Sequence, residues 1–316
     1  MAGTIRIGNH TIGEDSHCYV IAEIGHNHQG SIHKARELFK EAKLAGAHAV
    51  KLQKRNNRGL YTRAAYNKPY DNENSFGATY GEHREFLEFG AKEYRELQAY
   101  AKELDIDFFA TAFDLESADF LESLNVPAYK LASGDLKSEP LLKHVARFGK
   151  PMIVSTGGAE IDDVQRAYDA IMPINPQLAI LQCTAGYPAA FEELDLRVIS
   201  TFRERFPRAG VRLHPHSARG AGLANVLAAL EVGVDRFDAS VGGIGGCPFA
   251  PGAPGNICSE DLIHMLHEMG IATGVDLPGL LDCARMLEDL LGHELPGQTL
   301  KAGLCKHLPA GGGPRE

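Results

Sequence analysis

Short apolar segments recur along the chain, most of them about 20 to 30 residues apart. Helical spacing of apolar residues between them predicts helices over 31–44, 93–104, 117–124, 160–171 and 222–230. The eight apolar runs are CYVIAEIG (18–25), AVKLQ (49–53), DFFATAF (107–113), AYKLASG (128–134), PMIVSTG (151–157), LAILQCT (178–184), GVRLHPHS (210–217) and DRFDASVGG (235–243). Alternating strands and helices indicate an α/β protein with a parallel sheet, and eight such units predict a (β/α)8 TIM barrel. An open doubly wound sheet is the alternative.

The predicted barrel occupies residues 1–303 as one domain. Its opening, IRIGNHTIG (5–13), is expected to form a hairpin that closes the barrel floor. The long polar and aromatic connection 54–90 suits a lid or a substrate loop. The end of the chain, 304–316, contains PAGGGPRE and is expected to be disordered.

Composition narrows the class of protein. The chain has 316 residues, of which 44% are hydrophobic and 23% charged, as in ordinary soluble domains. No segment has the roughly 18 consecutive apolar residues of a membrane helix. Neither a secretory signal nor a C-x-x-C motif is found, and the six cysteines are scattered. We therefore expect a cytoplasmic protein without membrane association.

A net charge of −9 argues against nucleic acid as a partner, because phosphate backbones require a basic surface. An anionic small-molecule substrate would have to be held by local cations. Lys51 and Lys130 lie at the ends of predicted strands, where a barrel gathers its active site. Candidate substrate-binding residues at these strand ends are Lys51, Gln53, Thr111, Lys130, Ser133, Ser155 and Thr184. The alternative is that the lysines reach solvent and the hydroxyls cap helices.

Two histidines end the seventh predicted strand. Residues i and i+2 of a strand share a face, so His214 and His216 are expected to point together into the barrel mouth. Two imidazoles in this arrangement can bind a divalent cation. The alternative is a pair of structural histidines.

From about residue 18 to 207 the chain resembles the sialic acid synthase family, which condenses phosphoenolpyruvate with an amino sugar. The stretches that carry the resemblance include VIAEIGHNHQGS (20–31), VPAYKLASGDL (126–136) and CTAGYPAAFEELDLRVI (183–199). The resemblance implies that Glu23, Asp135 and Tyr187 lie near the reacting carbons, with Glu23 moving a proton or placing water. It also implies that phosphoenolpyruvate is bound by Lys51, Thr111, Lys130, Ser133, Ser155 and Thr184.

The chain departs from that family in several places. Gln182 stands where the family usually has a metal-binding histidine, and the family's motifs on strands seven and eight are absent. We also expect the family's C-terminal antifreeze-like domain to be missing. The resemblance therefore does not identify the acceptor sugar.

From about residue 211 to 303 the chain resembles 3-hydroxy-3-methylglutaryl-CoA lyase, above all in SVGGIGGCPFAPGAPGN (240–256). This resemblance implies that His214, His216 and Asn256 are metal ligands, with Glu23 in place of the lyases' strand-one aspartate. The mixed nitrogen and oxygen set suits Mn²⁺ or Mg²⁺. It also implies that Cys247 is a proton donor; the alternative is a free thiol on a mobile loop.

Three functions follow from the two resemblances. The first is a metal-dependent synthase that condenses phosphoenolpyruvate with an aldehyde or sugar. The second is a metal-dependent 3-hydroxyacyl-CoA lyase or aldolase. The third is a folded barrel with little or no activity, because catalytic groups that come from two joined parts can lie too far from their productive positions. The chain is either a natural recombinant or a constructed chimera, and we expect a homodimer.

Overall fold

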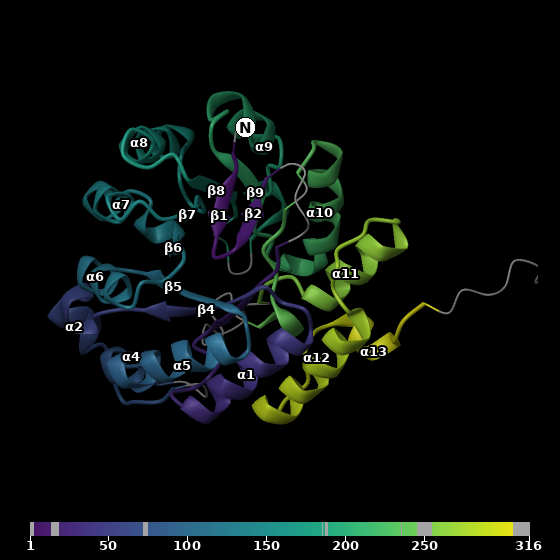
Figure 1. Cartoon of the computed structure of the whole chain (residues 1–316), viewed down its shortest axis with the longest axis horizontal. Helices are drawn as coiled ribbons and strands as arrows, with labels where there is room; N and C mark the ends of the chain where they lie inside the picture. The colour runs from purple at the N-terminus through teal and green to yellow at the C-terminus, as the bar shows by residue number, and fades with distance from the viewer. Residues whose placement is uncertain are drawn as a thin grey trace, which may run out of the picture.

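A computed structural model describes residues 3–13, 19–71, 75–184, 186, 189–234, 236–244 and 255–305. Seven parallel strands form a curved sheet in sequential order, and helices lie around its outer side (Figure 1). The strands are β3 Ile21–Gly25, β4 Ala49–Lys54, β5 Asp107–Ala112, β6 Tyr129–Leu131, β7 Met152–Ser155, β8 Leu178–Gln182 and β9 Gly210–Leu213. The predicted α/β architecture of the TIM-barrel type is confirmed.

The outer helices follow the predicted apolar spacing. In α1, the buried residues Ala35, Leu38, Phe39 and Ala42 recur at helical intervals, and the Ser31 side chain caps the helix by accepting from Lys34 N. The helices outside the long connection are α1 Ile32–Leu44, α5 Ala91–Glu103, α6 Leu115–Ser123, α7 Glu139–Ala146, α8 Ile161–Ile171, α9 Val198–Arg205, α10 Gly222–Glu231, α11 Ser259–Glu268, α12 Leu277–Leu291 and α13 Gln298–Ala302.

The eighth apolar run does not form the predicted strand. Among the residues placed in this segment, Leu213 pairs with Phe237 and Ser240 pairs with Cys258, each as an isolated parallel bridge. A cavity of about 120 Å³ lies between this segment and β3, and small side chains such as Ala22, Ala42 and Ala239 contribute to its lining. Because these side chains do not fill the space, the sheet stays open at this seam.

The opening hairpin is confirmed. Strands β1 Ile5–Ile7 and β2 His10–Ile12 pair antiparallel. Gly3 N donates to Arg208 O just before β9, so the hairpin lies at the amino ends of the barrel strands. Its three isoleucines are buried, which closes the barrel floor with apolar side chains.

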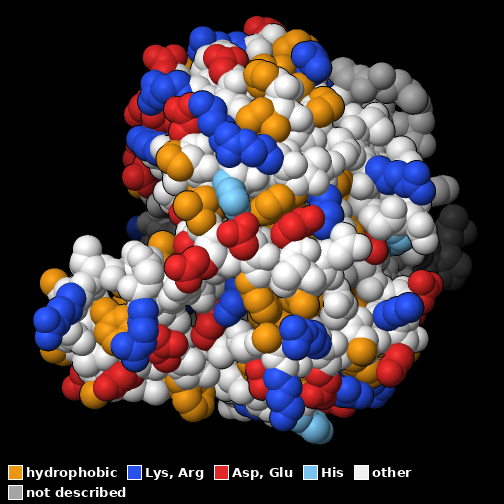
Figure 2. Space-filling view, turned by 60° about the vertical axis from the view of Figure 1, so that its left-hand side comes forward, with side chains coloured by type: hydrophobic (Ala, Val, Ile, Leu, Met, Phe, Trp, Pro, Cys, Tyr) orange, Lys and Arg blue, Asp and Glu red, His pale blue; other side chains and the backbone are white. Residues whose placement is uncertain are grey.

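In the long connection after β4, the described residues form the short helices α2 Asn57–Leu60, α3 Arg63–Tyr66 and α4 Tyr80–Leu87. On the face in Figure 2, acidic and basic side chains are intermingled. No helix within the described ranges is both long and apolar enough to cross a membrane.

Candidate active site

The sheet register brings the predicted lysine site together. Gln53 is paired with Thr111, and Thr111 with Lys130, so these residues lie at one level of three neighbouring strands. Lys130 Nζ donates to Ser155 Oγ on β7 and, at 3.0 Å, to its neighbour's carbonyl, Leu131 O. Since Lys130 is buried, its ammonium group faces the barrel interior and not solvent.

Lys51 lies on the same inner surface, where it forms an ion pair with Glu23 of β3. Burial, with a contribution from the neighbouring Lys130, lowers the pKa of Lys51 to about 7. The second carboxylate oxygen of Glu23, Oε1, is buried and has no hydrogen-bond partner among the residues described. Glu23 is therefore placed to bind a proton or a water molecule beside the two lysines.

The other predicted residues on the synthase-like side are arranged differently. Ser133 Oγ accepts from Gly157 N at 3.0 Å and lies 3.1 Å from Cys183 Sγ, so the hydroxyl is engaged by the loop after β7. Burial raises the pKa of Asp135 to about 6, although Arg55 and Lys130 oppose the shift. The carbonyl oxygen of Thr184 accepts a hydrogen bond from His216 Nδ1. Tyr187 and Cys247 lie outside the described residues.

The predicted histidine pair is formed. His214 Nε2 and His216 Nε2 are 3.1 Å apart. His216 Nδ1 donates to Thr184 O at 3.1 Å, and His214 Nδ1 lies 3.1 Å from Asp238 Oδ2. Because His216 Nδ1 donates to a carbonyl oxygen, a neutral His216 ring has its lone pair on Nε2, where it can accept from His214 Nε2 or bind a cation. Burial, followed by His214, lowers the pKa of His216 to about 3, which keeps its ring neutral.

Asn256 is the neighbour of this pair through its backbone. Its backbone bridges to His216, and its Nδ2 donates to Ile244 O at 3.1 Å. Asn256 Oδ1 is buried and has no hydrogen-bond partner in the part of the chain that is described. Two facing imidazole nitrogens and an orphaned amide oxygen fit a divalent cation with mixed ligands. Glu23 as a further ligand stays a prediction, because one of its oxygens is held by Lys51.

Asp238 is a site residue that sequence reasoning missed. It contacts His214 and, with Lys51 and Lys130, lines a cavity of about 220 Å³. Burial opposes ionisation, but His214, Lys51 and Lys130 together hold the pKa of Asp238 below its usual value. The residue is the second of two aspartates in the eighth apolar run (235–243), and a carboxylate within an apolar run was the available signal. It links the lysine half of the site to the histidine half.

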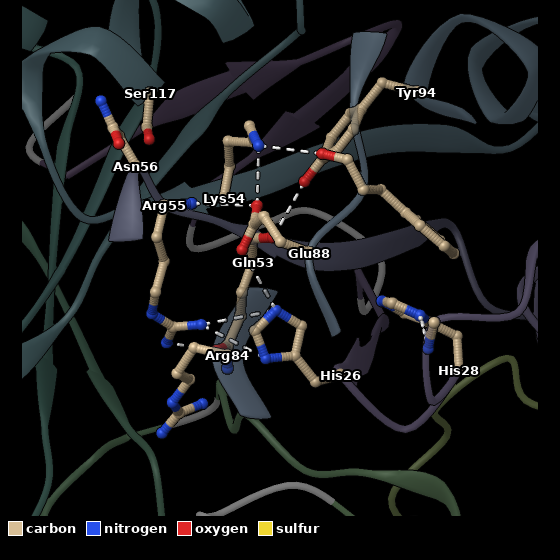
Figure 3. A network of polar contacts seen from close by, with 12 residues as sticks. His26, His28, Gln53, Lys54, Arg55, Asn56, Arg84, Glu88, Tyr94 and Ser117 are labelled. Carbon is tan, nitrogen blue, oxygen red and sulfur yellow. Dashed lines mark hydrogen bonds and ion pairs between the residues drawn. The ribbon is translucent and has the colours of Figure 1, made fainter. Parts of the chain in front are cut away.

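A second missed feature is the polar network after β4 (Figure 3). Arg55 Nη2 donates to Gln53 Oε1 at 2.6 Å, Arg55 Nη1 contacts the His26 ring, and the guanidinium stacks over Phe113. Glu88 Oε1 accepts from Lys54 Nζ at 2.8 Å and from Arg55 N at 3.1 Å. These contacts tie the long connection to the mouth of the barrel.

Comparison with known proteins gives two sets of relatives. The NeuB family model matches residues 38–237. N-acetylneuraminate-9-phosphate synthase of Homo sapiens is 40% identical over 222 residues, which are 70% of this chain and 61% of that protein. Hydroxymethylglutaryl-CoA lyase YngG of Bacillus subtilis is 44% identical over 188 residues, 59% of each chain. Both predicted resemblances are confirmed.

A solved structure of the spore coat polysaccharide biosynthesis protein SpsE from Bacillus subtilis superposes with a TM-score of 0.63 at 30% identity. The comparison covers 94% of this chain and 76% of that one. The chain spans about three fifths of the length of the synthases that it matches. With the family model matched over most of the chain and the lysine site formed on its strands, the protein belongs to the NeuB family and is sialic acid synthase-like.

Proposed function

We propose that the protein catalyses a metal-dependent condensation of phosphoenolpyruvate with the aldehyde group of an amino sugar. One observation carries this proposal. Lys51, Lys130 and Asp238 line one cavity, and Asp238 also contacts His214. The anion-binding half and the histidine half are therefore adjacent, as a reaction between an anionic substrate and a carbonyl compound requires.

The reaction joins C3 of phosphoenolpyruvate to the aldehyde carbon, whose oxygen takes up a proton. Water adds to C2 and loses a proton, the bond from C2 to the phosphate oxygen breaks, and inorganic phosphate leaves. Lys51 and Lys130 bind the carboxylate and phosphate oxygens, since buried ammonium groups attract such anions strongly. Glu23 Oε1, which has no partner among the described residues, accepts the proton of the attacking water.

The metal part of the proposal rests on the donor set. His214, His216 and Asn256 would hold Mn²⁺ or Mg²⁺, and the bound cation would polarise the carbonyl group as a Lewis acid. Asp238 and the carbonyl of Thr184 orient the two imidazoles through their Nδ1 atoms.

The test is phosphate release from phosphoenolpyruvate in the presence of Mn²⁺ and a panel of amino-sugar aldehydes. We expect release that depends on both the acceptor and the metal, and its loss in Lys130→Met and His214→Ala. Lys143→Met, an exposed lysine on α7 that pairs with Glu139, is the matched control and should keep activity. If folded wild-type protein releases no phosphate in response to any acceptor, the proposed reaction is excluded.

The ligand set also supports a second candidate, a metal-dependent 3-hydroxyacyl-CoA lyase. The observation that favours it is the contact between His214 and His216 together with the backbone bridge from His216 to Asn256. Incubation with 3-hydroxy-3-methylglutaryl-CoA and Mn²⁺ separates the two candidates, because the lyase forms a shorter acyl-CoA without phosphoenolpyruvate.

A further inference from the structure

One face of α11 holds the helix that follows it near the end of the chain. The Asp261 carboxylate accepts from Gln298 N at 3.0 Å and from Thr299 N at 2.6 Å, which fixes the start of α13 on this face (Figure 1). His264 lies three residues farther along α11, and its Nε2 accepts from Cys305 N at 3.3 Å, just after α13 ends. Both ends of α13 are therefore held by the same helix.

This arrangement brings together three side chains that commonly bind metals. Glu268 follows His264 by four residues on α11, so the two side chains lie on the same side of the helix. One ligand atom from each of His264, Glu268 and Cys305 lies within 4.8 Å of the other two. Imidazole, carboxylate and thiolate are the three types of side chain that bind Zn²⁺ in proteins. The thiol is accessible, since Cys305 is exposed, whereas the other cysteines in the described part of the chain are buried.

The spacing of these atoms is close to that of a zinc site. Bonds of about 2.0 to 2.3 Å in a tetrahedral set place neighbouring ligand atoms roughly 3.5 Å apart. Glu268 and Cys305 are exposed and His264 is half-buried, so small rotations of the side chains can bring the atoms closer. Because His264 Nε2 accepts from Cys305 N, a neutral His264 ring directs its lone pair at the residue that carries the thiol.

The neighbouring polar side chains have other contacts. The Asp261 carboxylate is engaged by the two amides of α13, and His267 Nε2 lies 2.8 Å from Thr273 Oγ1. Glu268 has a further interaction of its own, but a carboxylate has two oxygens and several lone pairs, so it can bind a metal as well. His264, Glu268 and Cys305 are therefore the ligands that this face offers to a cation.

We propose that His264, Glu268 and Cys305 bind one Zn²⁺ ion, with water as the fourth ligand, and that the ion fixes the segment after α13 to α11. Three protein ligands and one water molecule complete the tetrahedral coordination that Zn²⁺ favours. Binding releases the thiol proton of Cys305 to solvent, because the ligand is the thiolate. The site shares no residue with the histidine pair after β9, and it does not rest on the proposed function.

The experiment uses Co²⁺ as the probe, because Co²⁺ occupies zinc sites and a bond from Co²⁺ to a thiolate gives a charge-transfer absorption in the near ultraviolet. Full-length protein, treated with chelator and kept reduced with a phosphine, is titrated with Co²⁺ and then with Zn²⁺. We expect the absorption to grow with Co²⁺ and to disappear when Zn²⁺ displaces it. Cys305→Ala should lack the absorption. His214→Ala, which lacks the other proposed metal site, should keep it at full intensity.

The remaining ligands are tested by the affinity for Zn²⁺, measured in competition with a chromophoric chelator. His264→Ala and Glu268→Gln should each weaken Zn²⁺ binding at this site at least about tenfold, since even the outer-shell partners of metal ligands contribute that much. His293→Ala removes an exposed histidine just after α12, whose Nδ1 lies 3.0 Å from Glu294 O. This variant is the matched control and should bind as wild type.

Three results would each overturn the proposal. They are a wild-type protein without the thiolate absorption, an equal absorption in Cys305→Ala, and an unchanged Zn²⁺ affinity in either His264→Ala or Glu268→Gln. Melting temperatures in metal-free buffer show whether the variants are folded; Cys305→Ser and His264→Gln replace any that is not, and the same results decide. Phosphate release from phosphoenolpyruvate should be the same in Cys305→Ala as in wild type, so failure of the zinc site leaves the proposed function in place.

Discussion

His214 and His216 face each other through their Nε2 atoms at 3.1 Å, while each Nδ1 atom is directed at an oxygen acceptor. At this distance one Nε2 atom can donate a hydrogen bond to the other. In the proposed function, a divalent cation would replace the shared proton and be bound by both nitrogens. The geometry of the pair is the observation from which the proposed metal site is argued.

The first prediction concerns metal binding. Mn²⁺ at about 100 times its dissociation constant should stabilise the chelator-treated protein by about 2.7 kcal/mol, a rise of roughly 5 °C in melting temperature. His214→Ala and His216→Ala should each lose this rise. His144→Ala, which removes a histidine paired with Asp119 on the outer helices, should retain it. An undiminished rise in either site variant contradicts the assignment.

The second prediction is a pH dependence of phosphoenolpyruvate binding. The pKa of Lys51 is lowered to about 7, so the free protein loses this positive charge as the pH rises through 7. A bound anion favours the charged lysine, and binding above pH 7 must then take up a proton. We expect the dissociation constant to increase by up to about tenfold per pH unit above 7. Calorimetry in two buffers of different ionisation enthalpy measures the number of protons taken up on binding. If no proton is taken up at pH 8, Lys51 is not the titrating group.

The third prediction compares a buried ion pair with an exposed one. Glu88 and Lys54 are largely buried and 2.8 Å apart, and Glu88 also holds Arg55 N. Glu88→Gln should lower the free energy of unfolding by roughly 3 kcal/mol, because it leaves a buried ammonium group without a counter-charge. Glu96→Gln, which breaks the exposed pair with Arg36, should cost less than about 1 kcal/mol. Similar losses in the two variants, measured by urea unfolding, would contradict a role for burial.

The fourth prediction concerns Glu260, whose pKa is raised to about 7 by burial. Between pH 4.5 and 7 the unfolded chain loses this proton and the folded protein keeps it, so stability falls as the pH rises through this window. The loss can reach about 3 kcal/mol. Glu260→Gln can still accept from Gly242 N and should flatten the decline. Glu268→Gln, exposed on the same helix, should follow the wild-type pH profile of the free energy of unfolding.

The fifth prediction uses two glycines with similar backbone conformations. Gly242 has φ +62° and a Cβ there would lie 2.4 Å from Leu295 Cδ1, whereas Gly270 has φ +77° and open space around it. Gly270→Ala should cost roughly 1 to 2 kcal/mol for the left-handed backbone alone. Gly242→Ala should cost roughly 1 to 3 kcal/mol more, because the methyl group displaces a packed leucine. Equal unfolding free energies for the two variants would show that Leu295 moves freely.

The local pattern of residues determined the strands, the helices and much of the site. Period-3.6 apolar spacing placed α1 within one residue of its observed start, since the buried face and the Ser31 cap are both local properties. Lys51 lies within β4 and Lys130 within β6, and not at the strand ends where the sequence analysis placed them. The shared face of His214 and His216 followed from strand periodicity.

Tertiary structure decided which partners these side chains have. Lys51 pairs with Glu23 and Asp238 contacts His214 because strands distant in sequence meet in the curved sheet. The open seam beside β3 depends on how completely side chains fill the space between two segments. In the sequence, Arg212 is a basic residue within an otherwise apolar run. Only the fold shows that it lines the same cavity as Lys51 and Lys130. The sequence by itself determined where polar groups stand on each strand, because that depends on local periodicity; only the packed barrel decided which charges face each other, because that depends on distances across the barrel.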